Sequence, residues 1–335
     1  MGNTPAVSAY VWTPGLGPDP QALQRLRDSA PLPKKPMGEA WFISMDRGMF
    51  LGLMHDDPWQ WRSDQLGTAL FELSSGPGSF GPMREWTVWF DFLLPRAQAL
   101  IGTDAAQAIE GQSLHGSLAS AAFVHYADPI LPGRPPHVRR DLLDTLARTM
   151  LAPEYWNDGR VVPSCFFAPL SDSWIYGLRF NGRGPFAASC FLVLKYLEPE
   201  LIDGWFASVI AIDDPYWRAA LVIWLAGSTS LILDGEQPAT SEEDDQFPAS
   251  WSNCELVHGA MPKPSLDPTA QVTPFIDSQR RAAFLDSVRH HLNLQLLSQW
   301  GEALQPPPDQ TLPFDGSRWQ YDSAALLVVE RYDLR

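Results

Sequence analysis

Apolar residues recur at helical spacing through the C-terminal two thirds of the chain. One stripe repeats every four residues behind two prolines and consists of Val138, Leu142, Leu146 and Met150. The cleanest stripe stops before three consecutive prolines and consists of Phe284, Val288, Leu292, Leu296 and Trp300. A four-residue repeat is typical of an amphipathic helix, and proline favours a helix start but stops its continuation. We therefore expect a mostly α-helical body over residues 95–335, with a helix along each stripe.

Three more segments of this body read as helices. Residues 186–197 and 201–212 are candidates, and Asp214-Pro215 supplies an N-cap acid and a first-turn proline for an apolar helix over 217–225. The uncharged run 219–233 is shorter than the roughly 18 apolar residues of a membrane span. We therefore expect a buried central helix here and no membrane partner.

The first 94 residues follow another pattern. Residues 41–44 and 49–53 flank a plausible hairpin turn at 45–48, and 68–73 could add a strand. Within 86–92, apolar residues alternate with Thr87, Trp89 and Asp91, although the all-round apolarity leaves a short helix open. The predicted fold is therefore α+β, with a β-rich N-terminal region over 1–94 and a helical domain over 95–335.

Acidic charge dominates the chain, whose net charge is −15. Such a field repels a phosphate backbone and attracts a basic protein surface, which excludes nucleic acid and favours a basic partner. Residues 234–274 lack periodicity and predict a long surface loop that carries Glu242, Glu243, Asp244 and Asp245. These four acids, with Trp251 as an aromatic anchor, are the predicted partner-binding residues, and a merely solvated loop is the alternative.

Residue types that could carry chemistry are present but scattered. His55, Asp56 and Asp57 could bind a metal, although the following Pro58 makes a turn with capping acids the favoured interpretation. His290 and His291 lie on successive helix positions and point about 100° apart, so they cannot chelate together. Cys254 and His258 could form a nucleophile and base, but no third orienting group is evident. We therefore expect no catalytic residue, metal or cofactor, while an enzyme assembled from these distant residues remains an alternative.

Two helix starts are alike. Residues 137–143 and 216–221 each place an apolar residue before an arginine, behind an upstream proline. They resemble HEAT-type repeats, because Arg139 and Arg218 lie 79 residues apart, about twice the 40 to 47 residues of one repeat. The resemblance implies stacked helical pairs; independent helix packing would give the same spacing.

The C-terminus carries a second resemblance. Trp319-Gln320-Tyr321-Asp322-Ser323-Ala324-Ala325-Leu326 precedes Tyr332-Asp333-Leu334. This pattern resembles the end of helical immunity proteins that neutralise bacterial polymorphic-toxin nucleases, where it opens a short buried helix. The resemblance implies a non-enzymatic, immunity-type inhibitor of a basic toxin or effector. A scaffold or assembly protein is a further hypothesis, and the lack of a signal segment at the N-terminus leads us to expect a cytoplasmic location.

Overall fold

The computed structural model describes residues 9–37, 47–74, 83–100, 118, 136–163, 166–169, 178–180, 185–234, 275–304 and 316–334. The α-helices in these ranges are α1 (Pro20–Ser29), α2 (Ser63–Ser74), α3 (Met83–Ala97), α6 (Pro136–Asp144), α7 (Pro185–Tyr196), α8 (Ile202–Ile210), α9 (Pro215–Gly227), α11 (Ser278–His291), α12 (Leu294–Ala303) and α13 (Gly316–Tyr332). Shorter helical turns are η1 (Arg47–Met54), η2 (Pro58–Gln60), η4 (Gln98–Leu100), η5 (Leu146–Leu151), η6 (Pro153–Tyr155), η8 (Pro199–Leu201) and η9 (Ser230–Asp234).

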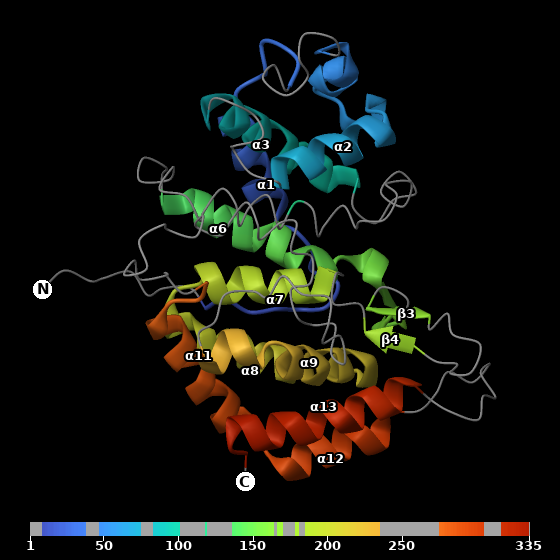
Figure 1. The fold of residues 1–335 in the computed structure, drawn as a ribbon, viewed down its shortest axis with the longest axis vertical. Coiled ribbons are helices and arrows are strands. Elements are labelled where there is room, and N and C mark those ends of the chain that lie inside the picture. Colours follow the sequence, from blue (N-terminus) through green and yellow to red (C-terminus); the bar gives the residue numbers. More distant parts are fainter. Residues whose placement is uncertain are drawn as a thin grey trace, which may run out of the picture.

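The helices stack in layers that largely follow chain order (Figure 1). The layer of α1, α2 and α3 lies at one end, followed by α6, then α7, then α8 with α9, and finally α12 with α13 at the other end. Contacts join neighbouring layers: α1 packs on α6, α6 on α7, and α9 on both α12 and α13, while α11 packs along α8. The predicted helical body is confirmed in this stack.

Strands are short and peripheral in the described residues. β1 (Trp156–Asn157) pairs antiparallel with β2 (Arg160–Val161), and β3 (Phe167–Pro169) pairs antiparallel with β4 (Leu178–Phe180). The β1–β2 turn places both Asp158 and Gly159 at positive φ, 49° and 74°, as a two-residue type I′ hairpin turn requires.

The predicted β-rich N-terminal region is wrong. Helix α2 occupies the predicted strand 68–73, α3 occupies 86–92, and η1 occupies all of 49–53. The other predicted hairpin strand, 41–44, lies outside the described residues. In α3 the aromatic residues that suggested alternation are buried on more than one face, including Trp86, Trp89 and Phe92. A helix buried on several faces loses its polar stripe, so its sequence cannot be distinguished from a buried strand by period alone.

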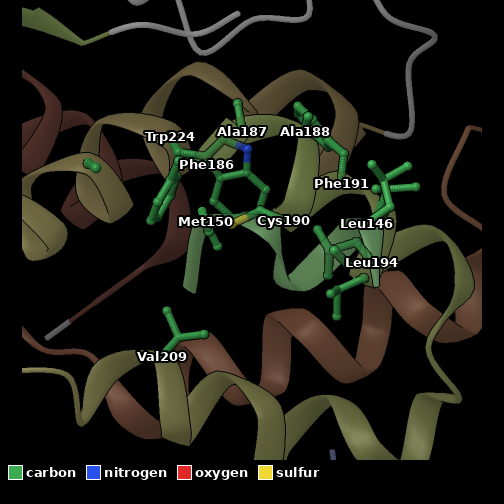
Figure 2. Packing of buried hydrophobic residues seen from close by; sticks show 14 of the residues in the cluster. Leu146, Met150, Phe186, Ala187, Ala188, Cys190, Phe191, Leu194, Val209 and Trp224 are labelled. Atoms are coloured by element: carbon green, nitrogen blue, oxygen red, sulfur yellow. The ribbon is translucent and has the colours of Figure 1, made fainter. Parts of the chain in front are cut away.

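The centre of the core is formed by α7 and α9. Eleven residues of α7 are buried, so that this helix has no solvent face beyond Lys195, and α9 carries the fully buried Trp217 and Trp224. Figure 2 shows Phe186, Cys190 and Phe191 of α7 among Met150 and Trp224. The expected central helix over 217–225 is thereby confirmed.

An extended N-terminal segment, residues 9–17, ties separate layers together. The hydroxyl of Tyr10 donates to the carbonyl of Leu143 in α6 at 2.7 Å, and the amide of Trp12 donates to Ser208 Oγ in α8 at 2.9 Å. The Trp12 ring packs edge-on against Trp205 and Trp217, with centroids 5.3 and 6.2 Å away. This segment, called the strap below, therefore spans the α6, α8 and α9 layers.

The two long stripes are helical but interrupted. Helix α6 ends at Asp144 and the stripe continues in the tighter η5. The stripe over 284–300 is divided between α11 and α12, because Leu292 is extended and Asn293 caps α12 by accepting from the amide of Leu296 at 2.8 Å. The apolar spacing survives the break, since both helices bury their stripe on the same core.

Candidate functional site

The predicted partner-binding residues Glu242, Glu243, Asp244, Asp245 and Trp251 lie outside the described residues, as does the dyad of Cys254 and His258. The two flanks of this region are described. Asp234 pairs with Arg331 of α13 at 2.7 Å, and the carbonyl of Phe275 accepts from Lys195 Nζ of α7 at 2.7 Å. The chain therefore leaves the body beside α13 and returns at the end of α7.

Lys195 is a partly buried base in the last turn of α7. Burial, followed by the nearby Arg280 guanidinium, lowers its pKa to about 8. Its ammonium lies 4.0 Å from the ring centroid of Phe275, and Arg280 Nε donates to the carbonyl of Leu197 at 2.8 Å. These contacts join the C-terminus of α7 to the N-terminus of α11, which is a structural arrangement.

His55, Asp56 and Asp57 are placed in a structural turn. Asp56 pairs with Arg27 and Arg96, each at 2.6 Å, and the bonds from Arg96 and then Arg27 hold its pKa below the ordinary value. Asp57 caps η2 by accepting from the amide of Trp59 at 3.1 Å. The favoured interpretation of capping is confirmed for Asp57. Among the described residues, no three His, Cys, Asp or Glu side chains gather as metal ligands.

In the histidine pair of α11, His291 takes part in a contact between α8 and α11. His291 Nε2 lies 3.0 Å from Asp203 Oδ1 of α8, and Ser287 Oγ donates to the same oxygen at 2.9 Å. The bond from Ser287, with that from His291, lowers the pKa of Asp203. A nucleophilic triad needs the imidazole between hydroxyl and carboxylate, but here the carboxylate lies between the other two. The trio therefore links α8 to α11. Sequence reasoning missed Asp203 and Ser287, although Ser287 and His291 share a helix face.

Cys190 is a core residue. Its side chain is fully buried, and burial raises the pKa of its thiol well above the ordinary value. A protonated thiol without solvent access is a poor nucleophile. Cys190 therefore has a structural role, whereas Cys165 and Cys254 lie outside the described residues.

An open groove of about 290 Å³ lies between α12 and α13. Its α12 wall consists of Leu294, Leu297, Ser298 and Gly301, and its α13 wall consists of Arg318, Tyr321, Asp322, Ala325, Leu326 and Val329. We call this feature the terminal groove, since it lies in the last helical layer (Figure 1).

The two walls of the terminal groove are fixed to each other. Gly301 permits close approach, because a Cβ there would lie 2.9 Å from Tyr321 Cε1. Tyr321 donates from its hydroxyl to the carbonyl of Leu297 at 2.6 Å, and burial raises its pKa. Arg318 donates to the carbonyl of Gly301 and pairs with Asp322 at 2.9 Å. The groove is therefore set by packing and hydrogen bonds between its walls.

Large apolar side chains at this end of the molecule are exposed to solvent. Trp319 is 50% exposed, Leu326 71% and Leu294 55%. The exposed residues of α13 include the apolar Trp319 and Leu326, the acidic Asp322 and Glu330, and Arg331, and the exposed Asp333 directly follows the helix. The immunity-like pattern thus lies in a 17-residue helix that is only partly buried.

A second pocket, of about 390 Å³, lies between the strap, the β1–β2 turn and the end of α8. Two of its polar side chains are already engaged: Ser208 accepts from Trp12 and donates to the carbonyl of Trp205 at 2.6 Å, and Asp213 pairs with Arg218 at 2.8 Å. The pocket is therefore a weaker candidate for binding than the terminal groove.

Comparison of the chain with known protein families, curated proteins and solved structures finds no match. Across the described ranges, none of the helices combines the length and apolarity needed to cross a membrane.

Proposed function

We propose that this chain is a non-enzymatic binding protein that occupies a basic protein partner, in the manner of an immunity-type inhibitor. The observation that carries the proposal is the surface of the last helical layer, where exposed Leu294 and Leu326 line the terminal groove and exposed Trp319 precedes Leu326 along α13. Contiguous exposed apolar side chains mark interaction sites, and aromatic residues are enriched among the anchors of interfaces.

Charge supports a basic partner. The chain carries −15. Asp322 lies between the exposed Trp319 and Leu326 of α13, and the exposed Glu330 and Asp333 follow Leu326 along the chain. Such a field accelerates association with a positively charged surface. The predicted acidic loop with Glu242–Asp245 would add to the same field, since its first flank, Asp234, pairs with Arg331 of α13.

Inhibition by occupancy needs no chemistry from this chain. A basic toxin or effector that acts on a phosphate-bearing substrate exposes Lys and Arg in its cleft, and an acidic surface that covers them blocks the substrate. The C-terminal resemblance to immunity proteins agrees with this interpretation, and we place the activity in the cytoplasm. The enzyme alternative gains no support from Asp56, Asp57 or His291, whose side chains already make structural contacts.

Affinity capture on the immobilised full chain, with mass spectrometry and light scattering of the eluted complex, tests the proposal. We expect one dominant basic protein at fixed stoichiometry, released by salt, whose own activity is lost in the complex. Many partners at variable stoichiometry would favour the scaffold hypothesis, and a captured protein that keeps full activity would contradict inhibition.

A further inference from the structure

The terminal groove has the shape of a binding site for one more helix. Its α12 residues, Leu294, Leu297, Ser298 and Gly301, follow the spacing i, i+3, i+4, i+7, which places them along one face. The α13 residues from Arg318 to Val329 repeat the same spacing on the opposite wall. Two facing rows of this kind receive the ridge of a third helix, as in helix-in-groove recognition.

The position in the stack agrees with this form. One face of α13 covers α9, so the inner side of the last layer is occupied, whereas Leu326 on the other side remains 71% exposed. Terminal units of helical stacks normally present a polar outer face. An apolar groove at this end is therefore not explained by a need for solubility, which would favour a polar surface.

The charged residues around the groove favour a positively charged occupant. Glu330 of α13 and Asp333, which directly follows the helix, are exposed carboxylates at this end, whereas Arg318 pairs with Asp322 and Arg331 pairs with Asp234. Lys or Arg side chains flanking an inserted helix would thus meet carboxylates. A second copy of this chain would instead bring −15 against −15, which opposes self-association.

We propose that the terminal groove binds an amphipathic helix of a partner protein, with its apolar face between α12 and α13 and basic residues flanking that face. The basic character of the bound helix rests on the proposed function, while its helical conformation is inferred from the shape of the groove alone. Because the groove walls are held by Tyr321 and Arg318, binding requires little reordering of this surface.

The test uses a labelled synthetic peptide of about 18 residues, or five helical turns, with leucine on one face and lysine on the other. Fluorescence anisotropy is measured with the full chain and with Leu294→Ser/Leu326→Ser. The matched control is Leu16→Ser/Leu32→Ser, which removes two leucines that are each 62% exposed at other sites. Both double variants are checked for an unchanged melting temperature.

We expect the groove variant to weaken peptide binding by about tenfold or more and the control variant to leave it within about twofold, because apolar anchors dominate such interfaces. A scrambled peptide of equal composition should bind about tenfold more weakly than the amphipathic one, because its leucines do not share a helix face. The groove proposal would be overturned if the groove variant bound the peptide as tightly as the wild type, or if the scrambled peptide bound as tightly as the amphipathic one. Neither result would contradict the proposed function, which the capture experiment tests separately.

Two further measurements distinguish the remaining results that would contradict the proposal. A peptide with glutamine in place of lysine that binds as tightly would refute the basic occupant and, with it, the charge argument of the proposed function. A wild-type dimer in light scattering that dissociates in Leu294→Ser/Leu326→Ser would identify a second copy as the occupant and overturn the proposal.

Discussion

Asp214 and Val161 lie 53 residues apart in sequence, and the Asp214 carboxylate accepts a hydrogen bond from the Val161 amide at 3.2 Å. The other carboxylate oxygen accepts from the amides of Tyr216 and Trp217, both at 2.9 Å, and so caps α9. One buried side chain therefore both starts the central helix and fixes the β1–β2 hairpin to it.

Asp214→Ala is expected to lower the free energy of unfolding by about 3 kcal/mol, since a helix cap is lost and a buried amide is left unpaired. Asp19→Ala removes the exposed cap of α1, which accepts from Gln21 alone at 3.0 Å, and should cost about 1 kcal/mol. Urea unfolding followed by circular dichroism measures both variants. Equal costs would show that the Val161 contact contributes nothing.

Leu221→Ala is expected to cost about 2 to 5 kcal/mol, because Leu221 is buried in α9 and its truncation leaves a cavity. The control Leu51→Ala, at a site 55% exposed, should change the free energy by less than about 0.5 kcal/mol. In the wild type, hydrogen exchange should be slowest in α7 and α9. Early exchange across α9 would contradict its central place.

Trp12→Ala tests the strap. We expect a loss of about 3 to 5 kcal/mol, since the Trp12 ring packs on Trp205 and Trp217 and its indole donates to the Tyr10 hydroxyl at 3.3 Å. The control Trp59→Ala removes an indole that is 62% exposed and should cost less than about 0.5 kcal/mol. Similar melting temperatures for the two variants would mean that the strap does not hold the layers together.

Lys195 should make the free energy of unfolding depend on pH in the alkaline range. Its folded pKa of about 8 lies below the ordinary 10.5, so between these values the unfolded chain binds the extra proton and stability rises with pH. Against Lys195→Met, the wild type should gain about 1.4 kcal/mol per pH unit between pH 8 and 10.5 and show no further gain above that range. The raised pKa values of Cys190 and Tyr10 act equally in both proteins and cancel. A pH-independent difference between the two proteins would refute the burial of this ammonium.

Much of the helical body was readable from sequence, and its errors have physical causes. Asp214-Pro215 identified the start of α9, because capping is a local interaction between neighbouring residues. The hydrophobic residues of α2, Leu66, Ala69, Leu70 and Leu73, are buried at helical spacing, and a strand prediction from 68 onwards began too late to reveal it. The Asp158-Gly159 hairpin was missed, although Asp-Gly is a common sequence for a type I′ turn.

The candidate surface was less predictable. The resemblance at the C-terminus pointed to α13, but the groove depends on Gly301 and Tyr321, whose contact is set by tertiary packing. Likewise, Asp203 meets Ser287 and His291 across 84 and 88 residues. The boundary at residue 94 remains a prediction; α1 joins α6 across it through the ion pair of Arg25 and Asp141 at 2.6 Å.

The most direct test of the central claim, binding of a basic partner by an acidic surface, is the association rate. Stopped-flow measurement compares the wild type with a variant in which Glu242, Glu243, Asp244 and Asp245 are replaced by Ser or Asn, against the captured partner across a salt series. The variant should associate more slowly, with a shallower salt dependence and a nearly unchanged dissociation rate, because exposed charges act mainly on encounter. Its fold should persist, since solvent-exposed charges, as predicted for this segment, contribute little to stability. Fast, salt-insensitive association by both proteins would contradict electrostatic recognition of a basic partner.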